Sequence, residues 1–353
     1  MSQSQTKNIK KIINKAVREN DLTKKEILTL LKTKGRLQEL LYRAADEVRS
    51  DNVGEGVHLR GIIEFSNYCS RNCSYCGLNR NNQELSRYRL EPEQIISMAA
   101  QACELGYKTI VLQSGEDDYY DTEMIKTIIN SIKEKNDTAI TLCVGEREYR
   151  EYEIWKKAGA DRFLLRHETS DSDLYEELHP GYSLESRLKR LKWLKQLGYQ
   201  VGSGNLIGIP GQTLDSIAED ILLFKKLKLE MVGLGPFIVH PVTQLDDAFS
   251  LEFKLEMTLK AIAITRLILP NCLIPATTAL GTLDPQGRQK ALQTGANVVM
   301  PNVTLGKYRA KYELYPAKIC IDEEPDNCRQ CIGSIINSLN RSVAKGHGHF
   351  REG

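Results

Sequence analysis

Short runs rich in β-branched residues alternate with longer helical stretches through most of this 353-residue chain. Eight such runs occur, at residues 57–66, 109–115, 138–145, 162–168, 201–208, 231–237, 273–279 and 297–303. Between them, apolar residues recur three and four positions apart, as at Ile125, Ile128 and Ile132, which is the period of a helix with one buried face. Eight strand–helix units in about 250 residues are what a closed parallel barrel requires. The sequence therefore predicts an α/β fold, a closed parallel (β/α)8 TIM-type barrel.

The predicted barrel occupies residues 51–310 and leaves a segment on either side. Residues 1–50 combine many charges with a helical period, and we expect an N-terminal helical extension packed on the outside or bottom of the barrel. Residues 311–353 form a short C-terminal segment with cysteines of its own, and its final "KGHGH" (residues 345–349) is typical of a frayed tail. A two-domain chain would need a polar linker near the middle, and the sequence has none.

Composition and charge exclude several classes of function. A hydrophobic content of 41% with 27% charged residues is typical of a globular protein rather than a disordered one. A net charge of +2 without a basic tail gives no electrostatic case for nucleic acid. Neither a signal peptide nor a run approaching ~18 apolar residues is present, so we expect a cytoplasmic protein with no membrane partner. In that reducing compartment, nine cysteines are better explained as metal ligands or buried small residues than as disulfides.

Three of those cysteines stand close together in "NYCSRNCSYCGLNR" (residues 67–80). Thiolates are soft ligands, so Cys69, Cys73 and Cys76 indicate zinc, an iron–sulfur cluster or a disulfide knot. No fourth ligand follows nearby, because the next histidine is His167. The segment directly follows the first predicted strand, and such loops form the functional face of a parallel barrel. Three thiolates can hold three irons of a four-iron cluster and leave the fourth iron an open position for a small molecule, as in catalytic metal sites.

This Cys-x3-Cys-x2-Cys loop after the first strand of a barrel resembles the radical S-adenosylmethionine (SAM) superfamily. The resemblance implies a 4Fe-4S cluster on Cys69, Cys73 and Cys76, whose unique iron chelates the amino and carboxylate groups of SAM. Electron transfer from the cluster to the sulfonium then yields a 5′-deoxyadenosyl radical. Tyr75, just before the last cysteine, matches the aromatic position of the motif. A zinc site is the alternative interpretation of the three thiols.

The resemblance also implies where SAM is held. Residues 113–117, "QSGED", stand where the superfamily carries a Gly-Gly-Glu-like segment that meets the SAM ammonium, and Ser114 replaces the first glycine here. Glu168 ends the fourth strand and Arg187 lies on the following helix, which gives SAM partners of both charges. The implied cofactor-binding residues are Tyr75, Gln113, Ser114, Gly115, Glu116, Glu168, Arg187, Met300 and Tyr312. The alternative for residues 113–117 is an ordinary βα turn, and the alternative for Glu168 and Arg187 is a surface ion pair.

Further segments narrow the resemblance to one family. The order and spacing of the HydE family, which helps to assemble the active-site cluster of FeFe hydrogenases, are matched by "RGIIEFSNYCSRNCSYCGL", "LQSGEDDYY", "LLRHET", "GIPGQT", "MVGLGPFIVHP", "IPATTALGT", "GANVVMPNVT" and "LYPAKIC". The similarity covers roughly residues 55–331. It implies a small-molecule substrate, an iron carbonyl cyanide complex bound to cysteine, which is carried toward the di-iron precursor. It also implies a reductant such as flavodoxin or ferredoxin, and the other hydrogenase maturases, as partners.

A cysteine-derived iron complex would bring a carboxylate into the barrel, where the charge must be paired. Arg166 and Glu168 share one side of the fourth strand because side chains alternate along a strand, so both can point into the lumen. Thr277 and Thr278 close the seventh strand with two hydroxyl groups. We therefore predict that Arg166, Thr277 and Thr278 clamp the substrate carboxylate, in line with the resemblance. The alternative is that Arg166 only neutralises Glu168 as a structural pair.

A second group of thiols, Cys320, Cys328 and Cys331, follows the last strand in a Cys-x7-Cys-x2-Cys pattern. Three thiols in so short a segment are poorly explained as chance core cysteines. The family resemblance implies an accessory iron–sulfur cluster here, 2Fe-2S or 4Fe-4S, which some members lack. Its place after the last strand sets it apart from the catalytic face of the barrel. Cys103 and Cys272 are better explained as small buried residues.

Three other interpretations are open at this point. Biotin synthase, a related enzyme, builds a second cluster from thiolates on several inner strands, whereas Cys143 stands alone here. A methylornithine synthase-like mutase shares the cysteine loop and the "GEDDYY" turn (residues 115–120). A non-enzymatic iron–sulfur scaffold would need neither the open coordination site nor polar strand ends such as Glu116, Arg166 and Glu168. Reductive cleavage of SAM separates the enzymes from the scaffold.

Overall fold

A six-stranded parallel sheet forms most of the barrel wall in the computed structural model, which describes residues 3–243, 245–321 and 323–352. Its strands follow one another in chain order, and each pairs in parallel with the next. They are β2 (Gly61–Ser66), β3 (Thr109–Ser114), β4 (Ala139–Cys143), β5 (Arg162–Leu164), β6 (Gln200–Ile207) and β7 (Met231–Pro236). All of them overlap predicted runs, so the parallel α/β architecture is confirmed.

Backbone hydrogen bonds continue the wall from β7 round to the first strands. β1 (Gly56–Leu59) pairs in parallel with β8 (Val298–Val299) on one side and with β9 (Ser342–Val343) on the other. Residues 273–276 exchange backbone hydrogen bonds with β7 and with β8, and residues 301–303 do so with β2. The seventh and eighth positions of the wall are therefore joined mainly by single bridges and two-residue pairings rather than long ladders.

Two predicted strands differ in the structure. The run at 57–66 is divided into β1 and β2 at Arg60. The run at 273–279 forms only isolated bridges, because its last residues already belong to a helix. Thr277 is the N-cap of α11 (Thr278–Leu283), and its Oγ1 accepts the Leu280 N–H. A threonine hydroxyl satisfies the free N–H groups at a helix start, which competes with continuing the strand.

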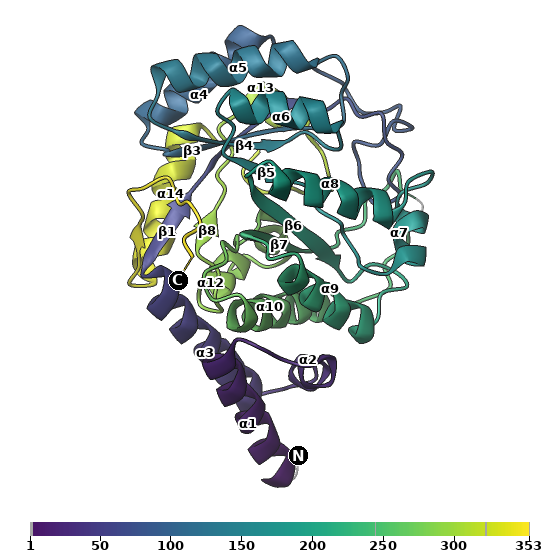
Figure 1. Cartoon of the computed structure of the whole chain (residues 1–353), viewed down its shortest axis with the longest axis vertical. Helices are drawn as coiled ribbons and strands as arrows, with labels where there is room; N and C mark the ends of the chain where they lie inside the picture. Colours follow the sequence, from purple (N-terminus) through teal and green to yellow (C-terminus); the bar gives the residue numbers. More distant parts are fainter. Residues whose placement is uncertain (1–2, 244, 322, 353) are drawn as a thin grey trace.

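Helices cover the outer face of the wall (Figure 1). In α5, four isoleucines three and four positions apart are buried, as the apolar period predicted. The helices that alternate with strands β2 to β7 are α4 (Pro92–Glu104), α5 (Thr122–Lys135), α6 (Tyr149–Lys157), α7 (Ser172–Leu178), α8 (Leu184–Gln196), α9 (Leu214–Lys226) and α10 (Leu251–Ile268). Beyond α11 come α12 (Gly287–Leu292), α13 (Gly306–Arg309) and α14 (Pro325–Ser338).

The predicted N-terminal extension consists of α1 (Gln3–Glu19), α2 (Lys24–Leu31) and α3 (Arg36–Val53). These helices pack against α9 and α10 on the outside of the barrel, and α1 projects from it (Figure 1). α1 buries one isoleucine-rich stripe, and a capping box between Thr23 and Glu26 fixes the start of α2. None of the helices in the described ranges is both long and apolar enough to cross a membrane.

The end of the chain crosses the opposite end of the barrel from the cysteine loop. After α14, β9 joins the wall beside β1. The His347 carbonyl then accepts hydrogen bonds from Thr109 and Arg162, which begin β3 and β5. Phe350 packs against residues at the start of β7 and β8. The expectation of a frayed tail is wrong, because these contacts depend on residues far away in the sequence.

Candidate active site

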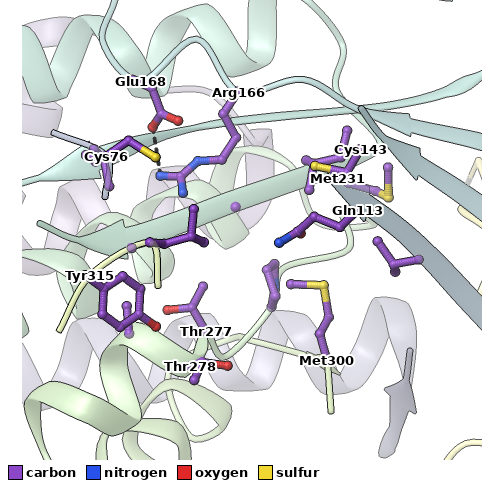
Figure 2. A pocket seen from close by; sticks show the side chains of 18 of the residues that line it. Cys76, Gln113, Cys143, Arg166, Glu168, Met231, Thr277, Thr278, Met300 and Tyr315 are labelled. Carbon is purple, nitrogen blue, oxygen red and sulfur yellow. Dashed lines mark ion pairs between the residues drawn. The ribbon is translucent and has the colours of Figure 1, made fainter. Parts of the chain in front are cut away.

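A cavity of about 340 Å³ lies inside the barrel. The predicted site residues that line it are Tyr75, Cys76, Gln113, Ser114, Arg166, Glu168, Thr277, Thr278, Met300 and Tyr312. In Figure 2, Cys76 lies beside the pair formed by Arg166 and Glu168, and the two threonines lie on the opposite side of the space. The fold thus brings residues from both halves of the barrel to one chamber. Cys69, Cys73, Gly115, Glu116 and Arg187 lie off the cavity wall.

The cysteine loop leaves the end of β2 and closes over β3. The Cys69 Sγ accepts hydrogen bonds from the backbone N–H groups of Arg71 and Glu116, both at 3.4 Å. A Cβ atom at Gly115 would overlap the Tyr68 carbonyl oxygen, so the loop can approach β3 this closely only at a glycine. Burial raises the pKa of the Cys69 thiol, and these two backbone donors oppose that rise.

The thiols of the loop are free, as are all nine cysteines of the chain, each of which the structure describes. Burial raises the pKa of the Cys73 thiol to about 12, and the neighbouring Cys69 adds to this shift. Burial likewise raises the pKa of Cys76. Binding of a metal ion favours the deprotonated form of such a thiol, since the thiolate is the ligand.

A network of ion pairs stabilises the cysteine loop. Arg71 pairs with Glu116 and reaches Glu146 at 3.2 Å. The Arg187 Nε lies 2.5 Å from Oε1 of the same Glu146, and Arg187 also donates to the Arg166 carbonyl oxygen. Burial would raise the pKa of Glu146, but the guanidinium of Arg187 and its neighbours hold that pKa below its usual value. Glu116 and Arg187 therefore support the loop in the structure, and their predicted contacts with SAM stay predictions.

Glu168 follows β5 with a φ of 64°, which is uncommon for a residue with a side chain and marks a constrained position. Hydrogen bonds to β6 hold its backbone, including one of 2.9 Å from its N–H to the Gly204 carbonyl. Its Oε2 lies 3.0 Å from the Arg166 Nη2 without hydrogen-bond angles, so this oxygen accepts no hydrogen bond within the described ranges. Burial raises the pKa of Glu168, and Arg166 opposes that rise.

The contacts of Arg166 are consistent with both predicted roles, the structural ion pair with Glu168 and the binding of a substrate carboxylate. The ion pair with Glu168 is the structural pairing considered as the alternative, and the Arg166 Nη2 also donates to the Asn205 carbonyl oxygen. The Arg166 Nε is buried and finds no acceptor in the part of the chain that the structure describes. An arginine N–H without an acceptor is costly in a closed chamber, so a bound anion would stabilise it. Both interpretations of Arg166 therefore have a physical basis.

The two threonines keep donors for a ligand. The Thr277 Oγ1 accepts the Leu280 N–H at 3.4 Å, and the Thr278 Oγ1 accepts a hydrogen bond from Arg288 at 3.3 Å. Each oxygen acts as an acceptor in these contacts, so the hydroxyl hydrogens are left for a carboxylate.

Sequence reasoning missed several residues of the cavity wall, above all Arg60. Its side chain is buried, with Nη1 2.9 Å from the Met231 sulfur and Nη2 3.2 Å from the Gly348 carbonyl oxygen. Burial lowers the pKa of Arg60, and the nearby Arg162 lowers it further. The sequence did contain an indication of this role. A single arginine inside a β-branched run either faces the lumen of the barrel or interrupts the strand. Arg60 does both.

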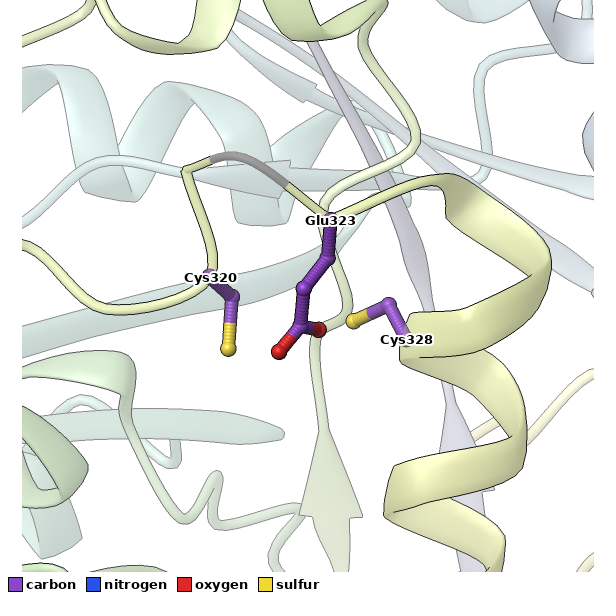
Figure 3. Close-up of side chains that lie close together, drawn as sticks. All are labelled: Cys320, Glu323 and Cys328. Atoms are coloured by element: carbon purple, nitrogen blue, oxygen red, sulfur yellow. The ribbon is translucent and has the colours of Figure 1, made fainter.

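The second cysteine group lies apart from the cavity, at the start of α14 (Figure 3). The ligand atoms of Cys320, Glu323 and Cys328 lie within 4.8 Å of one another. Cys331 is exposed and stands one helical turn after Cys328, outside this close group. Arg288 points an N–H at the Cys320 sulfur over 3.9 Å. The structure thus brings together two of the three predicted thiols and adds a carboxylate that the Cys pattern did not indicate.

A buried polar cluster, which sequence reasoning also missed, lies behind Glu168. Asp220 of α9 accepts hydrogen bonds from the Ser170 N–H at 2.5 Å and from the Asn205 Nδ2 at 2.6 Å. Burial raises its pKa to about 7, although these hydrogen bonds act against the rise. His167 lies 3.9 Å away, and burial lowers its pKa to about 3, so it is neutral. The signal was an aspartate on the apolar face of a predicted helix.

Comparison with known proteins joins this geometry to a family. The sequence model of the Radical SAM superfamily matches residues 63–224, which include the cysteine loop. The FeFe hydrogenase maturase subunit HydE of Thermotoga maritima is 50% identical over 312 residues, 88% of each chain. The chain therefore belongs to the HydE family of radical SAM enzymes.

More distant members of the superfamily share the architecture. The 3-methylornithine synthase of Methanosarcina acetivorans is 34% identical over 263 residues, covering 74% of this chain and 73% of its own. A crystal structure of a methylornithine synthase superposes with a TM-score of 0.83 at 28% identity and covers 94% of this chain and 97% of its own. Membership of the superfamily implies a 4Fe-4S cluster and SAM.

The residues present fit both groups. Three free thiols lie on one loop whose Cys76 lines the cavity, and Gly115 allows that loop to approach β3 closely. The buried Arg166 Nε finds no acceptor in the described ranges, and the Glu168 Oε2, which pairs with the Arg166 Nη2 at 3.0 Å, can accept a further hydrogen bond. A ligand with hydroxyl, ammonium and carboxylate groups supplies partners for both.

Proposed function

We propose that this enzyme uses SAM to act on a small cysteine-bound iron carbonyl cyanide complex during assembly of the active-site cluster of FeFe hydrogenases. The observation that carries the proposal is the three-thiol loop, which has no fourth ligand close by in the described ranges, beside a chamber lined by the buried Arg166 Nε, which finds no acceptor there. The similarity to HydE of Thermotoga maritima supports the choice of hydrogenase maturation within the superfamily.

On this proposal, Cys69, Cys73 and Cys76 hold the 4Fe-4S cluster. When bound, the cluster supplies the electron that cleaves SAM to methionine and a 5′-deoxyadenosyl radical. Glu168, whose Oε2 is paired with the Arg166 guanidinium, accepts hydrogen bonds from the SAM hydroxyls, and Tyr75 and Gln113 also line the chamber. The apolar walls exclude water, which protects a reactive radical from side reactions.

The substrate lies below SAM in the chamber. Its carboxylate is clamped by Arg166 on one side and by the hydroxyls of Thr277 and Thr278 on the other. A reductant such as flavodoxin or ferredoxin delivers the electron, and the other hydrogenase maturases act before and after this step.

Replacement of Cys73 by serine tests the assignment of the first cluster. We expect Cys73→Ser to abolish formation of 5′-deoxyadenosine by the reduced, reconstituted protein, because a cluster held by two thiols does not present one labile iron. Cys103→Ser, on the outer helix α4, is the matched control and should keep the wild-type rate. Wild-type cleavage in Cys73→Ser would overturn the assignment.

A mutase related to 3-methylornithine synthase is the second candidate, favoured by the 34% identity and by the shared fold. Both candidates cleave SAM, so cleavage does not separate them. The two differ in what consumes the radical. Incubation with a synthetic cysteine-bound iron carbonyl cyanide complex, in parallel with free amino acids, decides between them. Accelerated SAM consumption with the iron complex alone supports the maturase, whereas appearance of 3-methylornithine supports the mutase.

We further propose that Cys320, Cys328 and Cys331 hold an accessory iron–sulfur cluster, 2Fe-2S or 4Fe-4S. Their position outside the chamber supports an accessory role. Replacement of all three by alanine should lower the iron content while 5′-deoxyadenosine is still formed. Loss of SAM cleavage in a folded triple variant would show that the second site is required.

A further inference from the structure

The two cysteine groups differ in what lies next to their thiols. In the first group, the carboxylate of Glu116, whose backbone N–H donates to the Cys69 sulfur, forms an ion pair with Arg71. In the second group, Glu323 has its carboxylate beside the sulfurs of Cys320 and Cys328, all within 4.8 Å. Figure 3 shows the three side chains pointing toward one another. The difference concerns the number of protein ligands that each site offers to a metal.

Among the described residues, the Glu323 carboxylate has no hydrogen-bond or ion-pair partner that would compete with a metal. Its Oε2 is buried and accepts no hydrogen bond from residues within the described ranges, and no lysine, arginine or histidine there forms an ion pair with it. A buried carboxylate oxygen without a donor is unfavourable unless a cation is bound. Two thiols and a carboxylate that converge in this way can bind one metal site, and that binding would satisfy the carboxylate oxygen.

The backbone places Glu323 in this position. Arg309 is buried, and its Nη1 donates to both the Cys320 carbonyl oxygen and the Glu323 carbonyl oxygen. One guanidinium therefore holds the backbone carbonyl groups of residues 320 and 323 close together. Cys320 takes a φ of 63° at this turn. Such a position for a residue with a side chain costs free energy and is held by its surroundings.

Cys331 of α14 can join Cys320, Glu323 and Cys328 as a further metal ligand. It lies three residues after Cys328, and residues three apart share one face of a helix. Three thiolates and one carboxylate then surround the second site. Arg288, with an N–H directed at the Cys320 sulfur, offsets part of this negative charge.

We infer that Glu323 is the fourth protein ligand of the second iron–sulfur cluster, through its carboxylate oxygen. This inference rests on the accessory cluster proposed above. The first cluster leaves an iron open for SAM, whereas the second is closed by the protein at all four positions. A closed site binds no substrate, which separates structural from catalytic metal sites.

The test uses the full-length chain with the first cluster removed by Cys69→Ser, Cys73→Ser and Cys76→Ser, so that iron and spectra report only the second site. In this parent, Glu323→Ala and Glu323→Cys are compared with Glu324→Gln, which changes the exposed neighbouring carboxylate. After anaerobic reconstitution, iron and sulfide are counted, and the electron paramagnetic resonance spectrum of the reduced cluster is recorded with and without imidazole as a small competing ligand.

The parent and Glu324→Gln should show the same spectrum with and without imidazole, because no iron is open. Glu323→Ala should show a spectrum that shifts on addition of imidazole, or should lose iron that Glu323→Cys restores through a fourth thiolate. A Glu323→Ala spectrum that equals the parent and ignores imidazole would overturn the inference. So would a parent that responds to imidazole, or iron lost in Glu323→Ala and not regained in Glu323→Cys.

A parent that binds no iron at the second site would overturn the inference together with the accessory cluster on which it rests. The main proposed function is tested separately by SAM cleavage in the wild-type chain, which depends on the first cluster alone. The two failures are therefore distinguishable.

Discussion

Arg166 is the residue at which the two interpretations of the chamber diverge. Its ion pair with Glu168 supports a structural role, and its buried Nε without an acceptor supports a ligand. Removing one partner of a buried charge pair costs roughly 2–5 kcal/mol. At about 1.4 kcal/mol per decade of affinity, Arg166→Leu should weaken substrate binding at least about tenfold. SAM should still bind near-normally, because its cluster and hydroxyl contacts do not use Arg166.

Titration of both ligands against the variant measures this. Arg150→Leu, on the exposed side of α6, is the matched control and should change neither affinity. Equal loss of both affinities in Arg166→Leu would favour the structural pair with Glu168. An unchanged substrate affinity would remove Arg166 from the clamp altogether.

Asp220 should make the stability of the protein depend on pH. Burial raises its pKa from the usual 3.8 to about 7 in the folded protein, so between these values the folded state binds more protons than the unfolded state. The free energy of unfolding contributed by this group is therefore fully present below pH 4 and is lost as the pH rises through 7. At about 1.4 kcal/mol per pKa unit, the loss is on the order of 4 kcal/mol.

Asp220→Asn should remove this component of the pH dependence. The Asn205 Oδ1 has no donor within the described ranges, so a turn of the Asn205 amide lets it accept from the introduced amide. The measurement is the urea midpoint of wild type and variant at pH 5 and pH 8. The wild type should lose more stability than Asp220→Asn between the two values, and parallel losses would contradict the assigned pKa.

At the scale of elements, the contact between β6 and β7 depends on one glycine. A Cβ atom at Gly204 would overlap the Gly233 carbonyl oxygen of the neighbouring strand. Backbone cannot move aside as a side chain can, so Gly204→Ala should separate the strands locally and lower the free energy of unfolding by about 3 kcal/mol or more. Gly306→Ala, at the first position of α13 with nothing within 4 Å of the added methyl, is the control.

The Gly306→Ala change should be neutral or slightly stabilising, because alanine has the higher helix propensity. Urea unfolding of both variants provides the comparison. A Gly204→Ala protein as stable as wild type would mean that the two strands can part at little cost. Gly204 within β6 thus has a structural reason of its own, the close approach of β7.

The elements that the sequence predicted well are the buried parallel strands, since both of their faces are covered and they read as continuous apolar runs. The cysteine loop was equally accessible, because its ligands are close in sequence. The run at 273–279 was misassigned because helix capping by Thr277 outweighs β propensity. Arg60 and Asp220 were missed because their roles depend on partners in other elements. Glu323 was missed because a cysteine pattern carries no information about a carboxylate.

At the scale of the whole molecule, the end of the chain seals the barrel opposite the cysteine loop. Thr109 and His347 are 238 positions apart and share a hydrogen bond of 2.8 Å there. Such a contact has no local signal, which is why the sequence indicated a frayed tail instead. The tail also covers the buried guanidinium groups of Arg60 and Arg162.

Deletion of residues 346–353 should therefore destabilise the whole barrel, although these residues look dispensable in the sequence. We expect a loss of about 3 kcal/mol or more in the free energy of unfolding, since Phe350 leaves an apolar contact and two buried arginines lose acceptors. A stop after Phe350 removes only the last residues and is the control. Urea midpoints that are equal for both truncations would contradict a sealing role.

The C-terminal segment covers one end of the chamber, and the cysteine loop lies at the other. With SAM bound at the loop, as proposed, a molecule beside Arg60 would lie deeper in the chamber than SAM. We then expect ordered binding, in which the deeper molecule enters before SAM and the products of SAM cleavage leave before the other product.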